Sequence, residues 1–244
     1  MNVRGAKNVC DAATKFGIDT IIFTSSVAVY GFTEPNTDEN GDINYFNDYG
    51  RTKFLAEEIY NEWLQEDTKN RTLIIIRPTV VFGEENRGNV YNLLNQISSN
   101  KFLMIGNGKN IKSMAYVKNV AAFIKFSLNF KKGKHLYNYI DKPDINMRSL
   151  VSISRDMILN KKGVGISVPG FIGVIVGKLF DFISLIFNKD LPISSIRIKK
   201  FLSTSQFSSA TESIGFVPPY SLKDGLKRTI KNEFFQKDNE NNCS

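Results

Sequence analysis

Apolar positions along this chain follow two patterns, one typical of buried strands and the other of amphipathic helices. Residues 18–26 (IDTIIFTSS) and 73–77 (LIIIR) are apolar, β-branched runs without the alternation of a half-exposed strand. A strand that is covered on both faces of a parallel sheet has this composition. We therefore expect buried strands in both segments, and a third strand at 135–139.

Helical spacing fills the segments between these strands. Val9, Ala12, Ala13 and Phe16 recur three or four positions apart, and Gly17 is a typical C-terminal stop. The same analysis predicts four further helices, at 49–64, 89–99, 117–128 and 148–159. Because helices alternate with buried strands, we expect an α/β fold with a Rossmann-like, doubly wound parallel sheet.

Other segments do not fit the sheet and indicate a second lobe. The segment at 89–99 is a helix opened by a loop, and from 163 to about 206 the composition changes to apolar helix and basic loop. We expect a Rossmann domain at 1–83 and 115–160, and a small, mostly helical substrate lobe at 84–114 and 161–235. The polar residues 236–244 should form a flexible tail.

Charge and composition narrow the function classes. Lys and Arg number 32 against 24 Asp and Glu, a net charge of +8, but the basic residues are scattered and form only doublets such as Lys131–Lys132. This favours anionic substrates or an anionic membrane face over a nucleic-acid partner. Two cysteines, Cys10 and Cys243, and one histidine, His135, are too few for a metal site or a disulfide framework. We expect no metal, and a reducing compartment.

Tyr49 and Lys53 are four positions apart on a predicted helix and therefore share one face. A free phenol has a pKa of about 10, and a neighbouring ammonium group favours its phenolate form. Ser26 ends the first predicted strand, and the carboxyl ends of strands are where open α/β sheets bind ligands. Ser, Tyr and Lys in this arrangement suit alcohol–ketone interconversion with a nicotinamide cofactor.

Four segments follow one another in order: 2–9 (NVRGAKNV), 23–31 (FTSSVAVYG), 49–53 (YGRTK) and 77–83 (RPTVVFG). Together they resemble motifs of the extended short-chain dehydrogenase/reductase family, the NAD-dependent epimerases and dehydratases. The resemblance implies NAD as the cofactor and Ser26, Tyr49 and Lys53 as the catalytic residues. It also implies cofactor contacts from Asn2, Ser25, Tyr49, Lys53 and Thr79.

A closer resemblance follows in 86–94 (NRGNVYNLL), 112–117 (KSMAYV) and 195–201 (SIRIKKF). These segments are similar to one branch of the family, bacterial 4-epimerases of an N-acetylhexosamine carried on undecaprenyl diphosphate. The resemblance implies conversion of GlcNAc to GalNAc through a transient 4-keto sugar, for O-antigen or other surface polysaccharide. Candidates for binding the sugar diphosphate are Arg87, Asn89, Lys112 and Lys199.

Val27 and Ala28 stand where the family's dehydratases carry an Asp–Glu pair, so the resemblance implies epimerisation or simple oxidoreduction. A UDP-sugar 4-epimerase and a sugar dehydrogenase or reductase remain as alternatives. Lys112 stands where UDP-sugar relatives commonly have arginine, which weakens the case for a nucleotide substrate.

The family begins with a strand, a GxxGxxG turn and a helix that bind the cofactor's pyrophosphate. This sequence instead opens on a segment that resembles a later helix. We expect about two βαβ units, roughly 60–80 residues, to be missing. An inactive truncated fragment that does not bind NAD is therefore a further alternative.

Residues 164–187 form a long apolar run that Pro169, Lys178 and Asp181 interrupt. We expect a lobe helix with an apolar face rather than a transmembrane span, and peripheral contact with a membrane as the alternative. The family also implies a homodimer, formed by the helices that begin near Asn2 and Tyr49. We expect a cytoplasmic protein at the cytoplasmic face of the inner membrane.

Overall fold

The computed structural model describes residues 2–175, 178 and 195–236. The chain folds into two compact units. The first unit comprises Met1–Val81, Ser113–Lys142 and Gln206–Gly225, and the second comprises Phe82–Lys112, Pro143–Ser205 and Leu226–Ser244.

The first unit is built on a parallel three-stranded sheet in the order β1–β2–β7. The strands are β1 (Thr20–Thr24), β2 (Thr72–Pro78) and β7 (Gly133–Tyr139). Thr24 lies opposite Ile76, and Pro78 lies opposite Tyr139, so the carboxyl ends of all three strands meet at one edge of the sheet. The three predicted strands are confirmed, with bounds shifted by no more than two residues.

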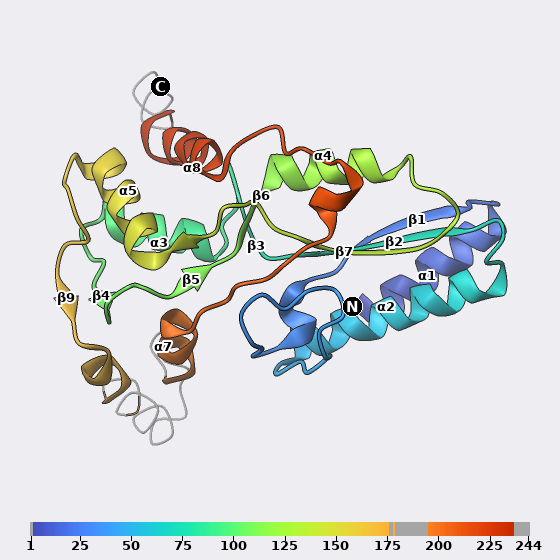
Figure 1. Cartoon of the computed structure of the whole chain (residues 1–244), viewed down its shortest axis with the longest axis horizontal. Coiled ribbons are helices and arrows are strands. Elements are labelled where there is room, and N and C mark those ends of the chain that lie inside the picture. Colours follow the sequence, from blue (N-terminus) through green and yellow to red (C-terminus); the bar gives the residue numbers. More distant parts are fainter. Residues whose placement is uncertain (1, 176–177, 179–194, 237–244) are drawn as a thin grey trace, which may run out of the picture. The chain divides into compact units, whose positions relative to one another are not determined.

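Helices cover both faces of this sheet (Figure 1). The helices α1 (Asn2–Lys15) and α2 (Asp48–Glu66) pack on the face to which Leu73 and Ile75 point. The helix α4 (Val117–Ser127) packs on the opposite face, against Ile74 and Ile76. The four residues Leu73–Ile76 of β2 are thus almost completely buried on both faces of the sheet. This explains why their sequence shows no alternation of polar and apolar positions. The doubly wound α/β arrangement is confirmed.

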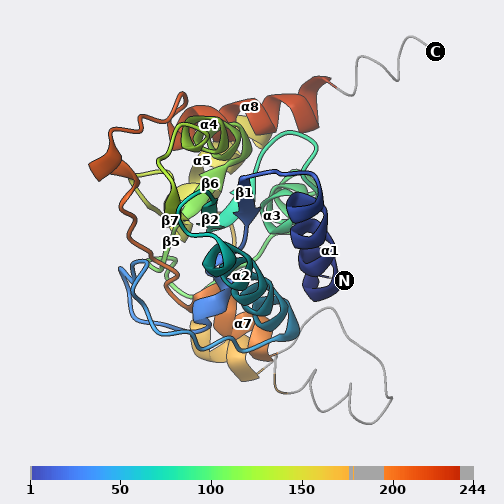
Figure 2. The same cartoon turned by 90° about the vertical axis from the view of Figure 1, so that its right-hand side faces the viewer.

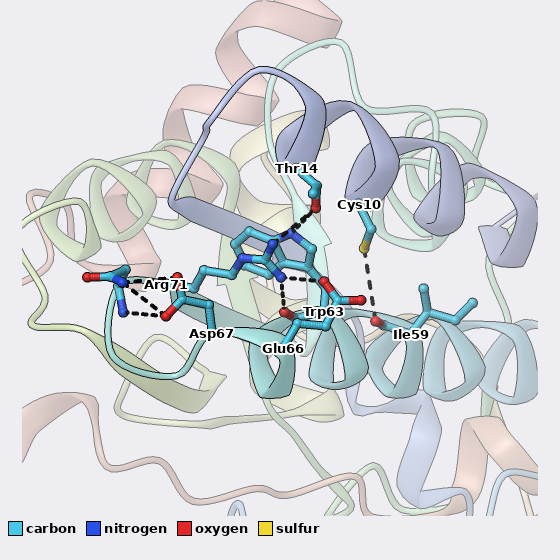
Figure 3. A network of polar contacts seen from close by, with 8 residues as sticks. Cys10, Thr14, Ile59, Trp63, Glu66, Asp67 and Arg71 are labelled. Atoms are coloured by element: carbon cyan, nitrogen blue, oxygen red, sulfur yellow. Dashed lines mark hydrogen bonds and ion pairs between the residues drawn. The ribbon is translucent and has the colours of Figure 1, made fainter.

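The helices α1 and α2 lie side by side (Figures 1 and 2), and polar contacts join them at one end (Figure 3). The indole nitrogen of Trp63 donates to the Thr14 hydroxyl at 3.2 Å. Arg71 donates to the same hydroxyl, to the Trp63 carbonyl and to Glu66. Its guanidinium carbon also lies 4.6 Å from the centroid of the Trp63 ring. These contacts set the register of α2, which carries Tyr49 and Lys53, against α1.

The remaining elements of the first unit are short: η1 (Val27–Tyr30), β6 (Met114–Tyr116) and η2 (Thr211–Ile214). The strand β3 (Val80–Phe82) and the helix α8 (Leu222–Lys231) contain points at which the chain passes from one unit to the other.

The second unit contains the helices α3 (Asn89–Ser98) and α5 (Met147–Leu159), which pack against each other. The strand β4 (Met104–Ile105) pairs with β9 (Ser167–Val168), and β5 (Ile111–Lys112) pairs with β8 (Ile145–Asn146). Two further elements are α7 (Ser195–Leu202) and η3 (Asn232–Gln236). The four strands were not predicted, because a two-residue strand is too short to show any periodicity.

Two segments lie in a different unit from the one that we expected. Residues 143–160 belong to the second unit, because α5 packs on α3 rather than on the sheet. Residues 206–225 belong to the first unit. There the backbone N–H of Ser208 donates to the carbonyl of Thr37, and Phe216 packs against Phe123. Helical periodicity predicts a buried face but does not identify the element that covers it.

The predicted apolar helix within 164–187 is described only up to Ile175 and at Lys178, where the residues from Gly170 onward are helical. The predicted tail after Gln236 lies outside the described residues. Among the residues that the structure describes, no helix is long and apolar enough to cross a membrane.

Candidate active site

Ser26 stands at the carboxyl edge of the sheet, where β1 leads into η1. The backbone N–H of Ser25 still bonds to the Ile76 carbonyl at 2.7 Å, as if it continued the strand. Ser26 is the N-cap of η1, and its Oγ accepts a hydrogen bond from the N–H of Ala28 at 3.2 Å. The local structure therefore orients the Ser26 hydroxyl at the edge where open sheets bind ligands.

Tyr49 lies in the first turn of α2, just after the N-cap Asn47, whose Oδ1 accepts from the Gly50 N–H at 2.9 Å. Its side chain is 51% exposed. Lys53, one turn later, donates through Nζ to the carbonyl of Thr24 at 2.8 Å, and this Nζ lies 6.0 Å from the centroid of the Tyr49 ring. The lysine thus links the helix that carries the phenol to the end of β1.

Lys53 is half-buried, and its Nζ lies 4.9 Å from the centroid of the Phe23 ring. Burial lowers the pKa of Lys53 below its ordinary value, and the negative charge of Glu57 partly offsets this shift. An ammonium group that is partly removed from water attracts a nearby negative charge more strongly than an exposed one. Lys53 is therefore suited to stabilise a phenolate beside it.

The other expected cofactor residues occupy the same part of the first unit. Asn2 donates to the hydroxyl of Thr52 at 3.1 Å, which brings the start of α1 to the Tyr49–Lys53 segment. Thr79 follows β2 at the carboxyl edge and donates through Oγ1 to the Tyr139 carbonyl at 3.3 Å. Ser25 is buried, and its hydroxyl donates to Glu57, so its side chain is engaged inside the protein.

Sequence analysis missed a buried ion pair directly behind these residues. Arg77 on β2 donates through two nitrogens to the carboxylate of Glu57 on α2, at 3.0 and 2.5 Å, and the two side chains are 5% and 2% exposed. Its third nitrogen donates to the Tyr30 hydroxyl at 2.8 Å. Burial alone would lower the pKa of Arg77, but the hydrogen bonds and charge of Glu57 outweigh it and raise the pKa. The sequence held one signal of this pair, because Arg77 is a charged residue in an otherwise apolar predicted strand.

The four candidates for binding a sugar diphosphate all lie in the second unit. Arg87 donates to the carboxylate of Glu233, which is buried, and its guanidinium carbon lies 4.1 Å from the centroid of the Tyr91 ring. Asn89 is exposed at the first position of α3. Arg87 therefore already forms an ion pair within the protein, and any substrate would share its guanidinium with Glu233.

Lys112 lies beside the C-terminal end of α7, the helix that carries the exposed Lys199. It donates through Nζ to the Ser203 carbonyl at 2.6 Å, and Asn110 donates to the Phe201 carbonyl at 2.7 Å. Carbonyl groups at a helix C-terminus lack partners within the helix, and a cation there is favourable. Burial lowers the pKa of Lys112 from 10.5 to about 8.

No group of three or more His, Cys, Asp or Glu side chains among the described residues could hold a metal ion. The polar groups at the carboxyl edge are instead a hydroxyl, a phenol and an ammonium group. These groups transfer protons or stabilise charge, and none of them accepts a hydride. An oxidation at this edge therefore needs a hydride acceptor other than these side chains.

Residues 1–139 match the sequence profile described as the NAD dependent epimerase/dehydratase family. This match covers more than half of the chain. The chain belongs to the NAD dependent epimerase/dehydratase family.

Within this family, the chain is 50% identical to the N-acetyl-alpha-D-glucosaminyl-diphospho-ditrans,octacis-undecaprenol 4-epimerase of Escherichia coli O157:H7, over 96% of this chain and 71% of that protein. It is 28% identical to a putative UDP-glucose 4-epimerase of Methanocaldococcus jannaschii, over 94% of this chain and 68% of that protein.

A solved structure, that of the UDP-glucuronic acid 4-epimerase from Bacillus cereus in complex with NAD, matches with a TM-score of 0.71. The match covers 95% of this chain and 66% of the chain in that structure, at 17% identity. It supports the Rossmann-type fold of the family. In the present chain, the exposed phenol of Tyr49 and the ammonium group of Lys53 lie at the carboxyl edge of the sheet, where open α/β sheets bind their ligands.

Proposed function

We propose that this protein is an NAD-dependent 4-epimerase that converts GlcNAc to GalNAc on undecaprenyl diphosphate, through a transient 4-keto sugar. The observation that carries the reaction type is the placement of Tyr49 and Lys53 on one helical face beside the end of β1. The identity of 50% with the Escherichia coli enzyme supports the choice of sugar and carrier. The product would serve O-antigen or other surface polysaccharide synthesis.

In this mechanism, Tyr49 exchanges a proton with the 4-hydroxyl of the sugar, taking it during oxidation and returning it during reduction. Lys53 stabilises the negative charge on the phenol oxygen while the proton is away. The hydroxyl of Ser26 orients the same sugar oxygen. NAD, when bound, supplies a hydride acceptor and donor and is regenerated in each turnover. Val27 and Ala28 offer no acid or base for removal of water.

The chain's remaining polar candidates would hold the two ligands. We assign the cofactor contacts to Asn2, Ser25, Tyr49, Lys53 and Thr79, with Ser25 contributing through its main chain. We assign the sugar diphosphate to Arg87, Asn89, Lys112 and Lys199, since their ammonium, guanidinium and amide groups donate hydrogen bonds to phosphate oxygens.

The proposed carrier is a polyprenyl lipid held in a membrane, so an enzyme that acts on it needs a surface that tolerates hydrocarbon chains. In the second unit, large apolar side chains are exposed between residues 166 and 175, among them Ile166 (74%), Phe171 (67%) and Ile175 (62%). Exposed lysines flank them at 161, 162 and 178. Apolar groups bordered by positive charge suit the face of an anionic membrane. We therefore propose peripheral contact at the cytoplasmic face of the inner membrane. Flotation with anionic vesicles should be lost in Phe171→Asp.

We also propose a homodimer through the exposed sides of α1 and α2. Val9 on α1 and Phe16 just after it are exposed apolar residues, at 45% and 71%. Light scattering of the purified chain should give twice the monomer mass, and Val9→Asp should return it to the monomer mass.

The activity is tested by supplying the chain with NAD and either GlcNAc-diphospho-polyprenol or UDP-GlcNAc. We expect acid hydrolysis of the products to release GalNAc only in the reaction with GlcNAc-diphospho-polyprenol. The absorbance of NADH should show no net change. Turnover of UDP-GlcNAc alone would move the proposal to the UDP-sugar epimerases. Net formation of NADH would indicate a dehydrogenase. No turnover together with no calorimetric binding of NAD would mean that this chain is not an active enzyme.

A further inference from the structure

One face of α2 contacts the segment that carries Ser26. Lys53 donates to the Thr24 carbonyl at 2.8 Å. One turn later, the carboxylate of Glu57 accepts the hydroxyl proton of Ser25. Both contacts lie within two residues of Ser26, and both come from the helix that also carries Tyr49. The position of Ser26 is therefore set by the same helix as the proposed proton-exchanging group.

The other end of this segment, at Tyr30, is held by Arg77, the partner of Glu57. Arg77 binds the Glu57 carboxylate with two nitrogens and the Tyr30 hydroxyl with the third, at 2.8 Å. Tyr30 is the last residue of η1, is fully buried, and donates in turn to Asn138 on β7 at 2.9 Å. The ion pair thus contacts residues on both sides of Ser26, at Ser25 and at Tyr30.

We propose that Glu57, paired with Arg77, is a positioning residue that clamps the segment Ser25–Tyr30 and so holds Ser26 in place relative to Tyr49 and Lys53. The effect on catalysis rests on the proposed function, whereas the effect on the segment does not.

A buried ion pair is a weak source of stability, because desolvation of both charges offsets their attraction. Its hydrogen bonds are directional, however, and a shift of about 1 Å takes each of them beyond hydrogen-bond distance. A displacement of this size in a catalytic group costs up to about a hundredfold in rate. The pair therefore matters more for the geometry of Ser26 than for the free energy of folding.

The sharpest variants remove one hydroxyl at either end of the segment and leave the ion pair intact. Ser25→Ala removes the hydroxyl that donates to Glu57. Tyr30→Phe removes the hydroxyl that accepts from Arg77 and donates to Asn138. Ser127→Ala is the matched control, since Ser127 is also a fully buried serine of the first unit, and its hydroxyl donates to the carbonyl of Ile124 at 2.8 Å in α4.

Two measurements on the full chain test the clamp. Amide hydrogen exchange of peptides that cover residues 24–31 should be about tenfold faster in Ser25→Ala and Tyr30→Phe than in Ser127→Ala, with other peptides unchanged. In the epimerase assay, kcat should fall about tenfold in both variants, while KM and the calorimetric affinity for NAD stay within about twofold of the control.

Exchange rates at 24–31 equal to those of Ser127→Ala would overturn the clamp, whatever the activity. Faster exchange with unchanged kcat in an active chain would overturn its catalytic part. Faster exchange in a chain that turns over neither substrate would support the clamp and contradict the proposed function instead.

Discussion

Gly50 lies so close to Ala28 that a Cβ atom at position 50 would be 2.4 Å from the Ala28 carbonyl oxygen. Gly50 is the residue after Tyr49, in the first turn of α2, and Ala28 is the second residue of η1, two after Ser26. The close approach of these two backbones is thus a direct link between the helix that carries the phenol and the turn that carries the serine.

Gly50→Ala should destabilise the protein although alanine is the better helix former by about 1 kcal/mol. The added methyl group meets the Ala28 backbone, and such overpacking typically costs about 1–3 kcal/mol. The free energy of unfolding in urea measures the effect. Gly5→Ala, in α1, is the control, because nothing lies within 4 Å of its Cβ position. Equal effects of the two substitutions would show that the contact with Ala28 is unimportant.

Tyr49→Phe should lower kcat by about 10²–10⁴-fold, because the variant cannot exchange a proton with the sugar hydroxyl. Its melting temperature should stay close to that of the parent chain, since the side chain is half-exposed. Tyr45→Phe is the matched control, another exposed tyrosine shortly before α2. If both variants retained full activity, another group would have to move the proton.

Lys112 should make the stability of the protein rise with pH. Its pKa is about 8 in the folded chain, because of burial, against an ordinary value of 10.5. Between these values the unfolded chain binds more protons, so the folded state gains stability as the pH rises above about 8. As the pH rises from about 8 to 10.5, the difference in unfolding free energy between the parent chain and Lys112→Met should therefore grow in favour of the parent chain.

The matched control for Lys112 is Lys112→Arg, whose guanidinium keeps its proton throughout this range. The difference in unfolding free energy between Lys112→Arg and Lys112→Met should not change with pH. If the difference between the parent chain and Lys112→Met also stayed constant with pH, Lys112 would not be held in a desolvated site.

Arg87→Gln should lower the melting temperature, because it removes the guanidinium that pairs with the buried carboxylate of Glu233. Glu233→Gln in the same chain should recover most of the loss, since the amide oxygen can still accept from the N–H of Glu85, which now lies 2.6 Å from the carboxylate. A thermal double-mutant cycle measures the coupling between the two positions. Strictly additive losses would mean that the pair contributes nothing.

How much could be predicted from the sequence depended on the range of each interaction. The runs 18–26 and 73–77 reveal strands because burial on both sheet faces requires apolar residues at successive positions. Tyr49 and Lys53 could be paired from spacing, since residues four apart on a helix share a face. Glu57 and Arg77 could not be paired, because they lie on different elements that meet only after folding.

The amino-acid sequence by itself determined the alternation of helices and buried strands in the first unit, the family, and the candidates Ser26, Tyr49 and Lys53. These follow from local periodicity and from ordered short motifs. Only the tertiary structure decided that α5 packs on α3, that residues 206–225 return to the first unit, and that Glu57 binds both Ser25 and Arg77. The physical reason is that side-chain packing and buried hydrogen bonds join residues far apart in sequence, and no local pattern specifies their partners.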